Sequence, residues 1–257
     1  MKFVRPKKRL GQHFLKDMRI AEEIVSALTI TSKDQKILEI GPGTGVLSDL
    51  LIPKDLSNLL LLDLDEESIA FLKEKYAGSR AEIQHGDYLK ESLTDWAGEG
   101  HYSIIGNFPY NISSQIFFKV LDQKDQVAEV VCMLQKEVAQ RITSGHGNKV
   151  YGILSIFIQA YYDVEYLFTV GAEVFDPPPK VQSAVIRLKR NDVKKLACDE
   201  GLFRRVVKQG FQMRRKTLRN ALKGLNLSPE VLSLEVMNKR AEQLTIQDFI
   251  NLTNTIK

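Results

Sequence analysis

The chain has 257 residues, 44% of them hydrophobic and 26% charged, which is typical of a globular protein with one large domain or a large and a small one. It has no run of about 18 apolar residues and no apolar stretch behind its basic N-terminus, so we expect neither a membrane span nor a secretory signal. The two cysteines lie far apart and the four histidines have no metal-ligand spacing, which favours reduced thiols in a cytoplasmic protein without a metal site.

The formal net charge of +4 is distributed unevenly along the chain. Residues 1–19 carry a net charge of +6 and residues 201–224 carry +8, whereas the remainder carries −10. Two basic segments on an acidic chain are typical of local contact with a polyanion, and we predict a nucleic acid. The alternative is that these charges lie on solvated helix faces and in a disordered tail. The residues that we expect to contact phosphates are Lys7, Lys8, Arg9, Arg214, Arg215, Lys216 and Arg219.

Apolar periodicity predicts helices and strands that alternate along the first two thirds of the chain. In chain order we expect a helix over 17–28, a strand over 37–40, a glycine loop over 41–45, a helix over 46–52, a strand over 59–62, a helix over 66–76, strands over 81–84 and 102–105, a helix over 113–121, a strand over 127–134, helices over 136–142 and 152–160, and strands within 163–170 and 181–188. This alternation is typical of an open, parallel α/β sheet with helices on both faces.

The pattern changes after residue 189. Residues 191–200 are polar, as in a linker, and the residues beyond them have the periodicity of short helices, expected at 202–211, 214–223, 229–233 and 245–256. We therefore predict a large α/β domain over 1–190, which includes a basic N-terminal segment over 1–16, and a small all-helical domain over 191–257.

Four residues suited to a ligand site lie at the ends of predicted strands or close behind them. They are Gly41, Asp63, Asp87 and Asn107. Ligands of open α/β sheets bind at the carboxyl ends of the strands, so the four predict one site at one edge of the sheet.

The segment Gly41-Pro42-Gly43-Thr44-Gly45 joins the first of these strands to a helix. Its glycines allow a tight turn and a close approach of a ligand to the backbone. Asp63 follows 22 residues after Gly41, where a carboxylate accepts hydrogen bonds from ribose hydroxyls. This arrangement suits a dinucleotide or S-adenosylmethionine. The Gly-x-Gly-x-Gly spacing and the acid Glu39, which would repel a pyrophosphate, favour S-adenosylmethionine, with Asp87 as an acceptor for the adenine amino group.

The segment Gly106-Asn107-Phe108-Pro109-Tyr110 ends the strand predicted over 102–105. It offers an amide oxygen from Asn107, an extended backbone before Pro109 and a flat aromatic face from Tyr110, all of which suit a planar amino group. The alternative is a loop in which Asn107 caps the next helix. The position beside the other strand-end residues favours a site.

Several motifs resemble those of the ribosomal RNA adenine N6-dimethyltransferases, whose fold is a Rossmann-like class I S-adenosylmethionine-dependent methyltransferase sheet. The resemblance covers nearly the whole chain. Its motifs are Lys8-Arg9-Leu10-Gly11-Gln12-His13-Phe14-Leu15, Glu39-Ile40-Gly41-Pro42-Gly43, Gly106-Asn107-Phe108-Pro109-Tyr110-Asn111-Ile112-Ser113, Leu134-Gln135-Lys136-Glu137-Val138, Phe175-Asp176-Pro177-Pro178-Pro179-Lys180-Val181 and Arg214-Arg215-Lys216-Thr217.

The resemblance implies a role for each matched position. S-adenosylmethionine would be held by His13, Leu15, Gly41, Gly43, Asp63, Asp87 and Asn107. The target adenine would be bound by Asn107, Pro109 and Tyr110, with Phe175 stacked on its other face as a fourth catalytic residue. The family commonly has Asn, Glu and Leu where this chain has His13, Asp63 and Phe108, and none of these changes removes a needed chemical group.

The reaction implied is dimethylation of N6 on two adjacent adenosines in a hairpin loop near the 3′ end of small-subunit (16S) rRNA, during assembly of the 30S subunit. The implied partner is that rRNA within the small subunit, the protein acting as a monomer. One alternative is an Erm-type enzyme acting on large-subunit (23S) rRNA. Another is a non-catalytic nucleic-acid-binding factor with the same fold, which the complete segment 106–110 argues against. The glycine spacing disfavours an NAD-dependent oxidoreductase.

Overall fold

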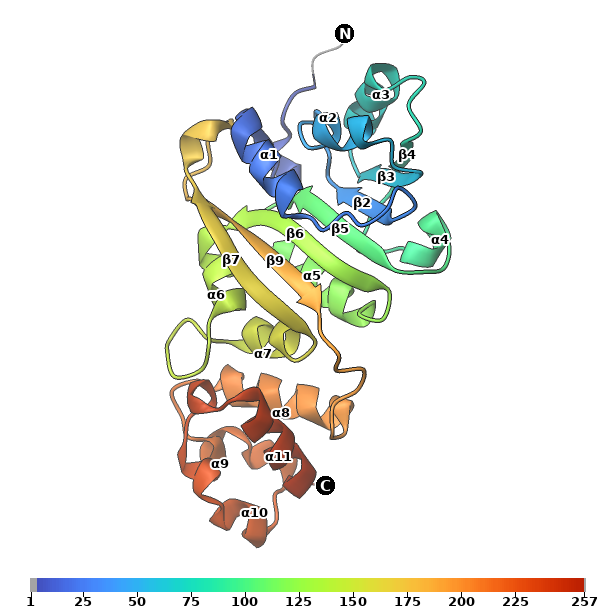
Figure 1. Ribbon diagram of the computed structural model, residues 1–257. Coiled ribbons are helices and arrows are strands. Elements are labelled where there is room, and N and C mark those ends of the chain that lie inside the picture. The colour runs from blue at the N-terminus through green and yellow to red at the C-terminus, as the bar shows by residue number, and fades with distance from the viewer. Residues whose placement is uncertain (1–3, 257) are drawn as a thin grey trace. The chain divides into compact units, whose positions relative to one another are not determined.

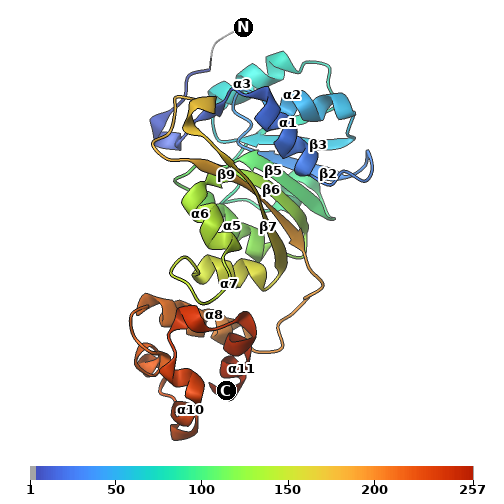
Figure 2. The same ribbon diagram turned by 60° about the vertical axis from the view of Figure 1, so that its left-hand side comes forward.

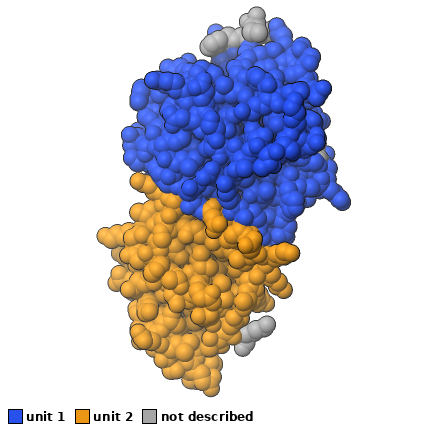
Figure 3. Space-filling view, viewed as in Figure 1, with its two compact units in different colours: residues 1–139, 164–190 blue, residues 140–163, 191–257 orange. Residues whose placement is uncertain are grey.

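The computed structural model describes residues 4–256, apart from the side chains of residues 96 and 97 (Figure 1). The first three residues of the predicted basic segment 1–16, and residue 257, lie outside the described part. The chain forms two compact units, unit 1 with residues 1–139 and 164–190 and unit 2 with residues 140–163 and 191–257 (Figure 3). The segment 140–163, expected in the large domain, groups with unit 2 by its contacts, and the boundary between folding domains at 190/191 stays a prediction.

Seven strands form one sheet in the order β4-β3-β2-β5-β6-β9-β7. They are β2 (Lys36–Ile40), β3 (Asn58–Asp63), β4 (Glu82–His85), β5 (Tyr102–Asn107), β6 (Val127–Gln135), β7 (Tyr162–Val170) and β9 (Ser183–Arg190). The strands from β4 to β6 pair in parallel, as expected, but β9 runs antiparallel to β6. The prediction of a wholly parallel sheet is therefore wrong at this edge. Between β7 and β9 the chain forms only a 3₁₀ turn (Ala172–Val174) and a two-residue strand, with no α-helix that could serve as the crossover of a parallel pair.

The middle strands are apolar along their whole length because both of their faces are covered. In β3, all residues after Asn58 are buried, and β2 is buried from Ile37 onward. The register pairs Ile40 with Leu62 and Glu39 with Ile105, so β2, β3 and β5 end level with one another. Their carboxyl ends form the edge at which we expect a site.

The helices of unit 1 lie on both faces of the sheet, with α1 and α2 in front of it and α5 behind it in Figure 1. They are α1 (Met18–Ala27), α2 (Ser48–Leu51), α3 (Glu66–Lys75), α4 (Leu93–Ala97), α5 (Ser113–Asp122) and α6 (Lys136–Thr143), the last of which extends into unit 2. Asp17 and Asp65 cap α1 and α3 by accepting backbone N–H groups of the first turn. All except α4 match a predicted helix, and α2 is shorter than expected because a 3₁₀ turn (Ile52–Lys54) replaces its end.

A two-residue strand near the N-terminus, β1 (Phe14–Leu15), pairs antiparallel with β8 (Phe175–Asp176). Leu15 and Phe175 are both buried in the same hydrophobic core as Ile24 of α1 and Val131 of β6. The pairing therefore attaches the N-terminal segment to the body of unit 1.

Unit 2 is helical. Its helices are α7 (Ile153–Gln159), α8 (Glu200–Gln212), α9 (Leu218–Ala221), α10 (Pro229–Ser233) and α11 (Ile246–Ile256), seen from a second side in Figure 2. The prediction of one helix over 214–223 is wrong, because residues 213–216 form a turn and a bend, Thr217 pairs with Arg240 in an isolated β-bridge, and the α-helix covers only Leu218–Ala221. None of the helices formed by residues 4–256 combines the length and the apolar character needed to cross a bilayer.

Candidate active site

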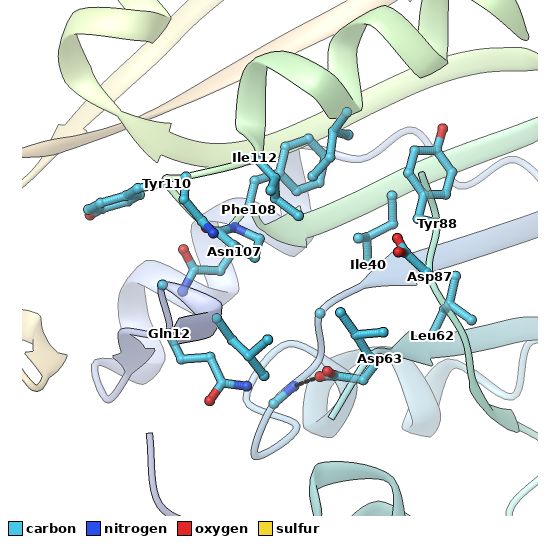
Figure 4. Close-up of a pocket in the computed structure, with 18 of the residues that line it drawn as sticks. Gln12, Ile40, Leu62, Asp63, Asp87, Tyr88, Asn107, Phe108, Tyr110 and Ile112 are labelled. Carbon is cyan, nitrogen blue, oxygen red and sulfur yellow. Dashed lines mark hydrogen bonds between the residues drawn. The ribbon is translucent and has the colours of Figure 1, made fainter. Parts of the chain in front are cut away.

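A cavity of about 260 Å³ opens in unit 1 at the carboxyl ends of β2, β3 and β5 (Figure 4). Of the residues predicted to bind the donor or the target base, eight line this cavity: His13, Gly41, Gly43, Asp63, Asp87, Asn107, Pro109 and Tyr110. Arg9, predicted to contact phosphate, lines it as well. They come from five separate stretches of chain, which the sheet edge brings together. In Figure 4, Asp63 and Asp87 lie near Ile40 and Leu62, and Asn107 and Tyr110 lie across the cavity from them.

The glycine loop after β2 forms one wall. Gly41 and Gly43 have φ values of +68° and +56°, in a backbone region that residues other than glycine rarely adopt. A Cβ on Gly43 would lie 2.8 Å from the ring of Phe14, another residue that lines the cavity. Glycine at position 43 thus allows both the turn and the close approach of the N-terminal segment.

Asp63 is fixed in place by the backbone around it. Its Oδ2 accepts a hydrogen bond from Gly43 N at 3.1 Å and its Oδ1 accepts one from Asp65 N at 2.9 Å. Burial raises the pKa of Asp63, and these backbone N–H groups act in the opposite direction. Each carboxylate oxygen has a second lone pair, so hydroxyl groups of a ligand have acceptors here.

Glu39 lies directly before the loop and is almost completely buried. Burial raises its pKa to about 8, although its Oε2 accepts a hydrogen bond from Ser48 Oγ at 2.7 Å. At neutral pH the carboxyl is therefore mainly protonated. The expected repulsion of a pyrophosphate by a charged Glu39 is accordingly a weaker argument than the sequence suggested.

Asp87 follows β4 and lines the cavity near Ile40. Its Oδ1 accepts from Leu89 N at 3.0 Å, and its Oδ2 lies 3.2 Å from the exposed Lys90 Nζ. The carboxylate is held by this local turn with its side chain partly accessible, beside the buried Tyr88.

Asn107 is the last residue of β5, and the N-terminal segment orients its side chain. The amide Nδ2 donates to the carbonyl oxygen of His13 at 2.8 Å. Because a carbonyl only accepts, this contact identifies the NH₂ end of the amide, and the Oδ1 atom lies on the other side. The side chain therefore presents an acceptor in a fixed direction.

Two more groups of the segment 106–110 have defined partners. The carbonyl of Pro109 accepts from Ile112 N at 3.2 Å and keeps its second lone pair. The Tyr110 hydroxyl is hydrogen-bonded to the hydroxyl of the buried Ser183, and burial raises the pKa of this tyrosine. His13 stacks on Tyr110 with ring centroids 5.3 Å apart, so a base stacked on Tyr110 would have to use its other face.

Two predicted site residues do not line the cavity. Leu15 and Phe175 are 4% and 1% exposed and lie in the core, because β1 pairs with β8. The resemblance implied that Phe175 stacks on the target base, whereas the structure buries its ring in the core. Its stacking on a target base, and contact of Leu15 with a cofactor, have no support from this geometry.

The predicted phosphate contacts separate into engaged and exposed side chains. Lys7 pairs with Asp65 and lies 3.1 Å from Glu67 Oε2, and the hydrogen bond to Asp65 raises the pKa of Lys7. Arg214 donates to the carbonyl oxygens of Tyr151 at 3.0 Å and Asn148 at 3.3 Å. The side chains of Lys8, Arg9, Arg215 and Lys216 are exposed, and that of Arg219 is half-buried.

The cavity also has walls that the sequence reasoning missed. These residues are Leu10, Gly11, Gln12, Phe14, Ile40, Leu62, Leu64, Gly86, Tyr88, Leu89, Phe108, Asn111, Ile112 and Ile116. Most of them are direct neighbours in sequence of predicted site residues. Their position beside the strand ends was therefore the feature of the sequence that could have identified them. Phe108 is buried, and its ring packs against that of Phe117 with the ring centroids 5.9 Å apart, so it forms part of the cavity wall.

The lining fits S-adenosylmethionine. Asp63 supplies acceptors for ribose hydroxyls, Gly41 and Gly43 admit the ligand to the backbone, and Ile40 and Leu62 offer apolar contact to a base. The geometry thus supports a ligand site at the predicted edge of the sheet.

The family profile described as "Ribosomal RNA adenine dimethylase" matches residues 4–257. Ribosomal RNA small subunit methyltransferase A of Cytophaga hutchinsonii is 53% identical over 256 residues, covering 100% of this chain and 99% of the relative, and that of Bacteroides thetaiotaomicron is 50% identical over 258 residues, covering 100% and 96%.

Among solved structures, a dimethyladenosine transferase from Plasmodium falciparum aligns with a TM-score of 0.80 and 27% identity, covering 93% of this chain and 96% of that one. The 23S rRNA methyltransferase ErmE aligns with a TM-score of 0.66 at 22% identity, covering 98% and 99%, which shows a shared fold. With the profile matched from residue 4 to the last residue and relatives half identical over their full length, this chain belongs to the ribosomal RNA adenine dimethylase family and is an S-adenosylmethionine-dependent rRNA methyltransferase.

Proposed function

We propose that this protein transfers methyl groups to N6 of two adjacent adenosines in a hairpin loop near the 3′ end of 16S rRNA, while the small subunit is assembled. The relatives named small subunit methyltransferase support the choice of subunit. The protein then works in the cytoplasm as a monomer, with the rRNA of the small subunit as its partner.

The observation that carries the proposal is the orientation of Asn107 in the cavity. Its Oδ1 and the carbonyl of Pro109 are two acceptors on residues two positions apart in one short segment, and they match the two N–H bonds of an exocyclic amine. The lone pair of adenine N6 is delocalised into the ring and is a poor nucleophile. Acceptors on both N–H bonds draw the nitrogen toward tetrahedral geometry and aim its lone pair.

When bound, S-adenosylmethionine supplies a methyl group that its sulfonium already activates. Asp63 and Asp87 would hold the donor at one side of the cavity, and Tyr110 would stack on a base that has left its helix. The contribution of the protein is mainly positioning, since the proton can leave N6 after attack. This accounts for a site without a catalytic histidine or cysteine.

The proposal is tested with methyl-labelled S-adenosylmethionine and ribosomal particles that lack these methyl groups. Small subunits, large subunits and naked rRNA are incubated with the protein, and the labelled nucleotides are mapped. We expect label on two adjacent adenosines of small-subunit rRNA. Label confined to large-subunit rRNA would identify an Erm-type activity instead, and no label despite donor binding would identify a non-catalytic factor.

The role of Asn107 is tested by replacing its acceptor. Asn107→Ala should lower methyl transfer by at least about 100-fold, the usual cost of losing one oriented polar group in a site, and should leave rRNA binding unchanged. Asn58→Ala, at the amino end of β3, is the matched control and should keep full activity. Transfer by Asn107→Ala near the wild-type rate would refute the role.

A further inference from the structure

The glycine loop is held from outside the cavity by the end of α3. Lys75 Nζ donates to the carbonyl oxygen of Thr44 at 3.1 Å, and the hydroxyl of Tyr76 lies 2.8 Å from the carbonyl oxygen of Gly45. None of these four residues lines the cavity. Two consecutive peptide groups of the loop are thus tied to α3.

Asp49, from α2, completes this arrangement. Its Oδ2 lies 2.7 Å from Lys75 Nζ and its Oδ1 lies 2.8 Å from the Tyr76 hydroxyl. The single hydroxyl proton of Tyr76 therefore lies between two acceptors, Asp49 and Gly45. Burial, followed by the hydrogen bond to Asp49, raises the pKa of Tyr76, so the hydroxyl keeps its proton. We call Asp49, Lys75 and Tyr76 the loop clamp.

The third glycine of the loop serves the loop clamp and not the ligand. Gly45 has a φ of +83°, and a Cβ there would lie 2.4 Å from the Tyr76 hydroxyl oxygen and 3.0 Å from Leu72. Only glycine leaves room for the hydroxyl at this distance. Gly41 and Gly43 line the cavity, whereas Gly45 does not.

The held carbonyls and the ligand-facing groups belong to one short turn. Gly45 N donates to Pro42 O at 2.8 Å, and Gly43 N donates to Asp63 Oδ2 at 3.1 Å. Peptide groups are planar, so fixing the carbonyls of residues 44 and 45 limits the planes next to them. A shift on the clamped side of the turn displaces the side that contacts the ligand and Asp63.

We propose that the loop clamp sets the position of the glycine loop and thereby the affinity for S-adenosylmethionine. Asp49, Lys75 and Tyr76 are positioning residues that do not touch the donor. The proposal rests on the assignment of the cavity as the donor site.

The test compares binding of S-adenosylhomocysteine, the demethylated product, by calorimetry. Lys75→Met removes the contacts with Thr44 and Asp49, and Tyr76→Phe removes those with Gly45 and Asp49. Each variant loses one hydrogen bond to the glycine loop and should weaken binding about 5- to 10-fold. The KM for S-adenosylmethionine should rise by a similar factor, with kcat and the KM for rRNA unchanged. Lys75→Arg keeps a donor and should retain most of the affinity. Lys73→Met, a change of the same kind at an exposed position of α3, is the control.

Gly45→Ala provides an independent route to the same result, since the added Cβ displaces the Tyr76 hydroxyl. Its effect on binding should add little to that of Tyr76→Phe in the double variant. Asp63→Asn reports on the site itself. If Asp63→Asn binds the product normally, the cavity is not the donor site. If Asp63→Asn loses binding while Lys75→Met and Tyr76→Phe bind as the wild type does, the loop clamp is overturned, and a lower Tm of these variants would then show a role in stability alone.

Discussion

At the scale of single residues, the site depends on side chains whose chemistry is changed by burial. Asp63, Asp87 and Asn107 could be found from the sequence because each follows a strand, and strand ends meet at one edge of the sheet. The protonation of Glu39 could not be found in this way. It results from near-complete burial under the loop and from the nearby carboxylate of Asp63, both of which depend on the folded packing.

Glu39 should make the stability of the protein depend on pH. Its pKa is about 8 in the folded state against an ordinary value of 4.5, so between these values the folded state holds a proton that the unfolded state has released. Stability therefore falls as pH rises through this window, by about 2–3 kcal/mol between pH 6 and pH 9. Glu39→Gln keeps an acceptor for Ser48 and should lose this part of the pH dependence in urea unfolding. Glu74→Gln, at an exposed position of α3, is the control and should keep the wild-type pH dependence. If the free energy of unfolding of Glu39→Gln falls between pH 6 and pH 9 as much as that of the wild type, Glu39 does not have this role.

At the scale of elements, the parallel strands and most helices followed from apolar periodicity, and the pairing of distant segments did not. The strand β1 is two residues long and has no periodicity of its own, and its partner β8 lies about 160 residues further on. The burial of Phe175 in the core was accordingly not predicted. The turn and bend over residues 213–216 were likewise missed, because polar and basic residues suit a solvated helix as well as a turn.

The N-terminal segment is an element in which two neighbouring lysines should behave differently. Lys7 is engaged by Asp65 and Glu67, and its backbone N–H donates to Gln12 Oε1 at 2.9 Å, whereas Lys8 is exposed. Lys7→Ala should raise the KM for S-adenosylmethionine several-fold with little change in rRNA affinity, because the segment it anchors forms part of the cavity wall. Lys8→Ala should do the reverse. Steady-state kinetics with each substrate varied in turn distinguishes the two, and equal effects on rRNA would show that both lysines contact it.

At the scale of the whole molecule, the two basic segments belong to different compact units, and only unit 1 contains the cavity. Both segments were expected to contact nucleic acid. In the second basic segment, however, Arg214 is half-buried and donates hydrogen bonds to the backbone carbonyls of residues 148 and 151. Charge alone did not distinguish it from its exposed neighbours Arg215 and Lys216.

Substitutions in this segment should separate binding from stability. Arg215→Ala and Lys216→Ala should each weaken rRNA binding and lower the slope of log affinity against log salt by about 1, as for a lost phosphate contact. Binding of S-adenosylhomocysteine should not change. Arg214→Ala should instead lower the Tm, since it leaves two backbone carbonyls without this partner. An unaltered salt slope in Arg215→Ala and Lys216→Ala would exclude phosphate contact by these side chains.

The pairing of β1 with β8 also dictates when the site is completed during synthesis. Residues 9–14 form one wall of the cavity, but the strand that anchors them, Phe14–Leu15, has to wait for Phe175–Asp176 to leave the ribosome. The glycine loop, Asp63, Asp87 and Asn107 have all emerged well before that point. A nascent chain thus carries the strand-end residues of the cavity without the wall that orients Asn107, and it gains the complete cavity only when nearly all of unit 1 has been made.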